Sequence, residues 1–88
     1  MEKRYEAVKN YRMARRENGV ILFNAYNEAC IELDRNSEKI FAFIESERPC
    51  MSEIINFGEK MGIVSEETEA FLLCLEETEF IYEDKRIS

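Results

Sequence analysis

The hydrophobic period of this 88-residue chain changes once, near Leu33, and that change limits the folds open to it. Before that point, residues 19–23 form a β-branched and aromatic run and residues 29–33 alternate between apolar and polar side chains. After it, Ile40, Phe41 and Ile44 recur at helical spacing. Strands grouped first and helices grouped afterwards predict an α+β fold, with an antiparallel sheet packed on helices.

Three strands are predicted. Residues 19–23 and 29–33 form a hairpin, and residues 11–16 alternate weakly ahead of a turn at Glu17-Asn18-Gly19. In the last strand Ala29, Ile31 and Leu33 share one face, and Cys30 and Glu32 share the other. We expect residues 1–10 to be a frayed or helical lead-in to the domain.

Three helices follow. The first begins behind Asp34 or Ser37, either of which is a suitable N-cap, and Pro49 stops it. The second spans residues 51–61, and the third begins at Ser65 and ends at Thr78 and Glu79. Residues 80–82 are predicted to be extended. One domain therefore covers residues 11–82, followed by a polar tail at residues 83–88.

Composition narrows the function. The chain has no histidine, the commonest general base and metal ligand, and its three cysteines form no Cys-x-x-Cys pair. We therefore expect no enzyme activity, no cofactor and no metal. The longest apolar run, residues 70–75, is far shorter than the roughly 20 residues that cross a bilayer. A cytoplasmic protein without a membrane partner is predicted.

Charge is unevenly distributed along the chain, which has a net charge of -7. Residues 1–16 hold six basic and two acidic side chains, so the other 72 residues hold six basic and 17 acidic ones. Residues 65–79 hold six glutamates and no Lys, Arg, Asn or Gln, so this helix cannot serve as a DNA-recognition helix. The basic beginning is either a solvated strand or a contact for an acidic partner.

Two features leave an interpretation open. Thr68, Phe71, Leu72 and Leu75 form the core-facing stripe of the third helix, yet Leu73 lies on nearly the opposite side. It is either a lone exposed leucine or part of an apolar groove for a peptide. Likewise, residues 29–33 form either a protected sheet edge or an edge that accepts an added strand.

An ordered set of short motifs resembles PqqD-like proteins, the recognition elements of ribosomally synthesised and modified peptides. The motifs lie within residues 11–82 and are Leu33–Ile40, Glu45–Arg48, Ser52–Ile55, Phe71-Leu72 with Leu75, and Phe80-Ile81. Departures from the family pattern fall at turns and caps, namely Asp34, Ser46, Cys50 and Glu79.

The resemblance implies a winged helix-turn-helix with an N-terminal three-stranded antiparallel sheet followed by three helices. In that family the leader of a precursor peptide adds as a strand to the third strand, in a cleft closed by the third helix. Carried over, the peptide-binding residues are Ala29, Cys30, Ile31, Glu32 and Leu33 on the strand, Ala70, Leu73, Cys74 and Glu77 on the helix, and Glu66 and Glu69 at the rim.

The function that follows is a non-catalytic peptide chaperone, which presents the leader-bound precursor to a separate modifying enzyme of the radical S-adenosylmethionine type. Two alternatives remain. A self-associating structural or adaptor subunit would use the same groove to form a homodimer. A nucleic-acid-binding winged helix would have to bind through residues 1–16, because the third helix is acidic.

Overall fold

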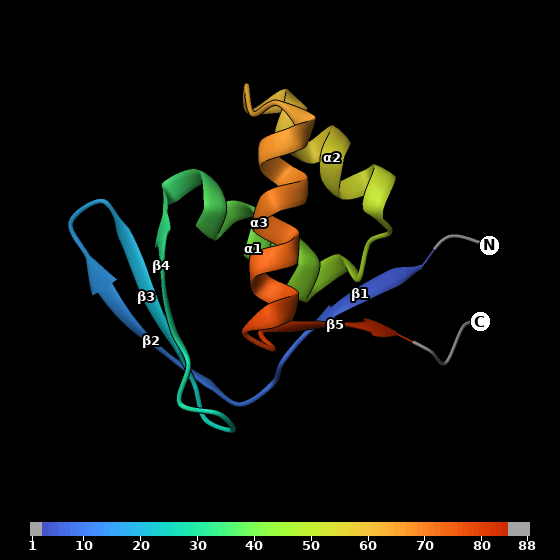
Figure 1. Ribbon diagram of the computed structural model, residues 1–88. Coiled ribbons are helices and arrows are strands. Elements are labelled where there is room, and N and C mark those ends of the chain that lie inside the picture. Colours follow the sequence, from blue (N-terminus) through green and yellow to red (C-terminus); the bar gives the residue numbers. More distant parts are fainter. Residues whose placement is uncertain (1–2, 85–88) are drawn as a thin grey trace.

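A computed structural model describes residues 3–84 and shows an α+β fold (Figure 1). The elements, in chain order, are β1 Arg4–Ala7, β2 Tyr11–Arg16, β3 Gly19–Asn24, β4 Cys30–Asp34, α1 Arg35–Glu47, α2 Met51–Lys60, α3 Ser65–Glu77 and β5 Ile81–Asp84. The predicted three-stranded antiparallel sheet and the three helices are confirmed.

The three-stranded sheet has the order β2-β3-β4, so β3 is central and β4 is an edge strand. Arg16 pairs with Gly19 across the predicted turn, and Val20 pairs with Leu33 on the other side of β3. Position 19 requires glycine because a Cβ there would overlap the main-chain carbonyl oxygen of Leu33. The hairpin register therefore depends on a residue without a side chain.

Residues 4–7 form a strand and not the frayed or helical lead-in expected from the sequence. Antiparallel pairing joins β1 to β5, with Tyr5 opposite Glu83 and Ala7 opposite Ile81. Tyr5 and Val8 are buried in the core. The same pairing draws residues 83 and 84 out of the predicted polar tail, whose remaining residues, 85–88, lie outside the described part. The domain thus includes a second, two-stranded sheet.

The helix ends follow capping chemistry. Asp34 is the N-cap of α1, because its Oδ1 accepts the main-chain N–H of Ser37 at 2.8 Å. Arg48, with a φ of 48°, ends that helix just before Pro49. At the start of α2, the Glu53 carboxylate accepts the N–H of Cys50 at 3.0 Å. Gly62, with a φ of 85°, follows the second helix as predicted.

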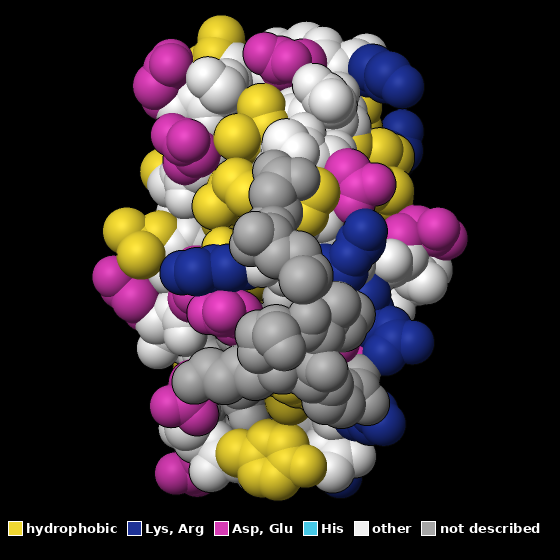
Figure 2. All heavy atoms as spheres, turned by 90° about the vertical axis from the view of Figure 1, so that its right-hand side faces the viewer, with side chains coloured by type: hydrophobic (Ala, Val, Ile, Leu, Met, Phe, Trp, Pro, Cys, Tyr) yellow, Lys and Arg dark blue, Asp and Glu magenta, His cyan; other side chains and the backbone are white. Residues whose placement is uncertain are grey.

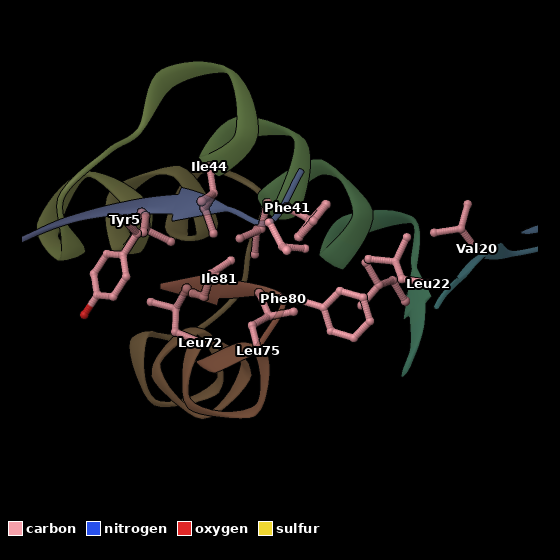
Figure 3. Packing of buried hydrophobic residues seen from close by; sticks show 13 residues of the cluster. Tyr5, Val20, Leu22, Phe41, Ile44, Leu72, Leu75, Phe80 and Ile81 are labelled. Atoms are coloured by element: carbon pink, nitrogen blue, oxygen red, sulfur yellow. The ribbon is translucent and has the colours of Figure 1, made fainter. Parts of the chain in front are cut away.

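One core joins the helices to both sheets. Figure 3 shows Phe80 pointing toward Leu22 of the three-stranded sheet, with Ile81, Leu72 and Leu75 beside it. All five side chains are at most 2% exposed. Thr68, Leu72 and Leu75 of the predicted core stripe are buried, and Phe71 is partly buried.

Candidate functional site

The exposed edge of β4 is the first component of the site. Asn24 at the end of β3 donates its main-chain N–H to the carbonyl of Ala29 at 2.8 Å. Hydrogen-bonded pairs alternate along an antiparallel ladder, so Ile31 and Leu33 bond to β3 next. The main-chain groups of Cys30 and Glu32 then point away from β3, toward the open edge. That edge offers donors and acceptors to another strand.

The side chains of β4 alternate as predicted. Leu33 is buried, and Ala29 and Ile31 are partly buried against the core. Cys30 and Glu32 are exposed on the opposite face of the sheet. A strand added to β4 would therefore continue a surface that is apolar on its inner face.

A cavity beside α3 forms the second component. Phe71 lines this cavity of about 320 Å³ together with Asp34 and Ser37 at the end of β4 and the start of α1. Helical spacing puts Glu67, Cys74 and Thr78 on the same side of α3 as Phe71. We call the cavity, together with the edge of β4 that ends beside it at Asp34, the β4–α3 cleft.

The two ends of the β4–α3 cleft differ. At the lower end in Figure 1, the loop between β3 and β4 is fastened to the end of α3. The Asn24 side-chain amide donates to the carbonyls of Thr78 at 3.2 Å and Glu79 at 2.9 Å, and Asn27 donates to Thr78 at 3.1 Å. At the other end lies the 320 Å³ cavity. Hydrogen bonds thus close one end of the cleft, and a cavity lies at the other end.

The hollow end is acidic. Asp34 and Glu67 are the charged residues among those that line the cavity, and α3 continues the negative charge with further glutamates. Asp34 also caps α1, so its position is fixed by a main-chain hydrogen bond. A lysine or arginine side chain is the complementary group for this end of the cleft.

The structure brings some of the predicted groove residues to the cleft and not others. Cys74 lies on the same side of α3 as Phe71 by helical spacing, but it does not line the cavity, and neither do Ala70 and Glu77. Leu73 is 57% exposed and projects from a different side of the helix, roughly 160° from Phe71. Glu66 and Glu69 are exposed and do not line the cavity either.

Phe71 lines the cavity, although sequence reasoning assigned it only to the core. Its partial burial reflects a position between the core and the cleft. The spacing of Glu67, Phe71, Cys74 and Thr78 gives the signal that could have found it, because these residues form one continuous stripe of a helix.

Basic side chains lie on another part of the molecule. The exposed residues of β2 include Arg12, Arg15 and Arg16, and Arg15 pairs with Glu38 of α1 at 3.0 Å. Figure 2 shows a related separation on one face, where Lys and Arg gather mainly along the right-hand flank and Asp and Glu along the left. On this face the two kinds of charge are therefore partly separated.

Two of the residues with a shifted pKa outside the cleft have hydrogen-bonded side chains. Burial, helped by a 2.6 Å hydrogen bond to Glu45, raises the pKa of Tyr11 to about 12. The hydrogen bond from the Cys50 N–H lowers the pKa of Glu53, and Arg4 adds to this effect. Both side chains connect elements of the fold: Tyr11 connects β2 to α1, and Glu53 connects α2 to β1.

Metal ligands, helix hydrophobicity and cysteine pairing can each be described for residues 3–84. That range holds no group of three or more His, Cys, Asp or Glu side chains placed to bind a metal ion. None of its helices has the length and apolar character that a membrane span requires. Cys30 and Cys74 are free and exposed, whereas Cys50 is free and buried.

Comparison with known proteins gives no relative. No protein-family model matches the chain, and no curated protein or solved structure matches it either.

Proposed function

We propose that this chain is a non-catalytic peptide chaperone that binds the leader of a precursor peptide by strand addition to β4. The observation that carries the proposal is the outward-facing main chain of Cys30 and Glu32, next to the partly exposed inner row of Ala29 and Ile31. Main-chain hydrogen bonds would give affinity, and alternate side chains of the leader would enter the β4–α3 cleft.

The resemblance of residues 11–82 to PqqD-like proteins supports this proposal. A third sheet strand followed by three helices is the element order that the resemblance implies, and here β4 and α3 occupy those two places. The finer part of the proposal is that the domain is a winged helix-turn-helix of this kind. Its partner would be a separate modifying enzyme, of the radical S-adenosylmethionine type in the family.

The cleft favours a particular kind of leader. Phe71 and Cys74 on one wall and Ile31 on the other favour apolar side chains at alternate positions of an extended peptide. Asp34 and Glu67 favour a lysine or arginine where the peptide reaches the cavity. The chaperone would then increase the effective concentration of the precursor at the enzyme.

The test is a fluorescence-anisotropy titration with leader peptides encoded beside this chain in its genome, with an unrelated peptide as control. We expect saturable binding of one leader at micromolar concentration or below. Cys74→Glu should weaken that binding by about tenfold or more, because it puts a charge into the apolar part of the cleft.

Leu73→Glu is the matched control, since it adds the same charge to the adjacent exposed position on another side of α3. It should leave the affinity within about twofold of the unmodified protein. Equal losses for the two variants would contradict the cleft assignment. Failure of every neighbouring leader to bind would contradict the chaperone function.

A further inference from the structure

The outer face of the three-stranded sheet is a second surface that the cleft does not use. All three helices lie on the other side of this sheet in Figure 1. Register and alternation place eight residues on the outer face: Arg12, Ala14 and Arg16 of β2, Gly19, Ile21 and Phe23 of β3, and Cys30 and Glu32 of β4. Asp34, at the end of β4, caps α1 and lines the cavity instead. No described element covers it.

The centre of this outer face is apolar. Phe23 is 41% exposed, and Ile21, two residues away on the same strand, is partly exposed. Ala14 and Cys30 flank them on the neighbouring strands. Exposed apolar side chains that adjoin on a flat sheet indicate an interaction surface.

The two edges of the outer face carry opposite charges. Arg12 and Arg16 lie on β2, and Glu32 lies on β4. Because β3 separates these strands, their main chains lie about 9–10 Å apart laterally. Among the described residues, none forms an ion pair with Arg12, Arg16 or Glu32.

We infer that a second copy of this chain docks on the outer face, sheet against sheet, about a twofold axis parallel to β3. This axis lays β2 of each copy over β4 of the other. Glu32 then lies between Arg12 and Arg16 of the second copy, and Phe23 meets its own counterpart at the axis. A twofold axis perpendicular to the strands would instead stack β2 on β2 and bring arginine against arginine.

The size of the face sets the strength of the dimer. Three strands of about five residues form a face of roughly 14 by 17 Å. That footprint is small beside the roughly 800 Å² per partner of a standard interface. We therefore expect a reversible dimer that forms in the range of about 10 µM to 1 mM. The open edge of β4 and the β4–α3 cleft stay accessible in it, so each dimer has two peptide sites.

Sedimentation velocity over that concentration range tests the inference. The unmodified protein should pass from monomer to dimer as concentration rises, and Phe23→Lys should raise the dissociation constant at least about tenfold. Tyr26→Ser is the control, because Tyr26 is also an exposed aromatic side chain but lies in the loop after β3. It should leave the dissociation constant unchanged. Far-ultraviolet circular dichroism verifies that each variant is folded.

Charge exchange tests the orientation. The pair Arg12→Glu with Arg16→Glu should abolish dimerisation, and so should Glu32→Arg alone. Combining all three substitutions should restore it to within about threefold, because the opposite charges again face each other. A monomer at every concentration would overturn the inference, as would a dimer that persists with Phe23→Lys or a triple variant that stays monomeric.

Discussion

The two sheets of this small domain differ in how much of their surface is buried. The β1–β5 pair lies against the helices, with Tyr5 and Ile81 buried. In the three-stranded sheet, β2 is exposed along most of its length, and both β2 and β4 are edges. The first sheet closes the core and the second leaves main chain and apolar side chains accessible. The contrast indicates that both sheets contribute to the core, through Tyr5 and Ile81 in one and Val20 and Leu22 in the other, whereas the surfaces of the proposed binding belong to the three-stranded sheet.

The largest expected effect is on the core between the two sheets. Phe80→Ala should lower the free energy of unfolding by about 3–5 kcal/mol, because it removes a fully buried ring and leaves a cavity. Denaturant unfolding measures the loss. Phe23→Ala, on the outer face, is the control and should cost less than about 1 kcal/mol. Equal losses of unfolding free energy for Phe80→Ala and Phe23→Ala would contradict the difference drawn between the buried core and the exposed outer face.

Asn24 links the two regions, and its removal should have the next largest effect. Asn24→Ala removes three side-chain hydrogen bonds at a buried position, two to the carbonyls of Thr78 and Glu79 and one from the N–H of Tyr26. We expect a loss of about 1–3 kcal/mol in thermal or chemical unfolding. Asn27→Ala removes two hydrogen bonds at an exposed position, to the carbonyl of Thr78 and from the N–H of Ala29, and should cost less. A larger loss for Asn27→Ala would show that the buried link does not dominate.

The junction between β4 and α1 should show a smaller effect. Asp34→Ala removes the side-chain cap of Ser37 and should lower stability by about 1 kcal/mol. Asp34→Asn keeps a capping oxygen and should recover most of that loss. If the asparagine variant is as unstable as the alanine variant, the cap is not the source of the effect.

The smallest effect concerns the contact between β2 and α1 at alkaline pH. The pKa of Tyr11 is raised from 10.0 to about 12, so the folded state keeps the phenol protonated where the unfolded state ionises. This contribution to stability is full below pH 10 and falls as pH rises from 10 to about 12. Tyr11→Phe should therefore flatten the decline in melting temperature across that window. An unchanged slope would contradict the assignment.

The strands and helices that depend on local pattern were predicted well from the sequence. The alternation of residues 29–33, the turn before Gly19 and the caps at Asp34 and Gly62 each act within a few residues. β1 was missed because it has only four residues and its partner, β5, lies at the other end of the chain. A strand that short is stabilised by non-local pairing, which local pattern does not reveal.

The candidate site was predicted less completely. The edge position of β4 followed from its being the last strand of a short meander, and the structure confirms it. Sequence reasoning placed Leu73 in the groove, because an exposed leucine on an acidic helix is conspicuous in sequence, whereas the residue of α3 that lines the cavity with Asp34 is Phe71. The orientation of a helix depends on what it packs against, and the Asn24 and Asn27 bonds to its end reveal that only in the structure.

The proposed strand addition requires β4 to bind a peptide through its outward-facing main chain. Proline at position 32 tests this requirement most directly. Glu32→Pro removes an N–H that points to the open edge and leaves the ladder to β3 intact, as an edge strand tolerates. Glu32→Ala keeps the N–H and removes only the charge.

The measurement is the affinity of both variants for the leader that the unmodified protein binds. Strand addition predicts at least about a tenfold loss for Glu32→Pro and a change within about threefold for Glu32→Ala. Equal affinities of a folded Glu32→Pro variant and the unmodified protein would contradict binding through the edge of β4.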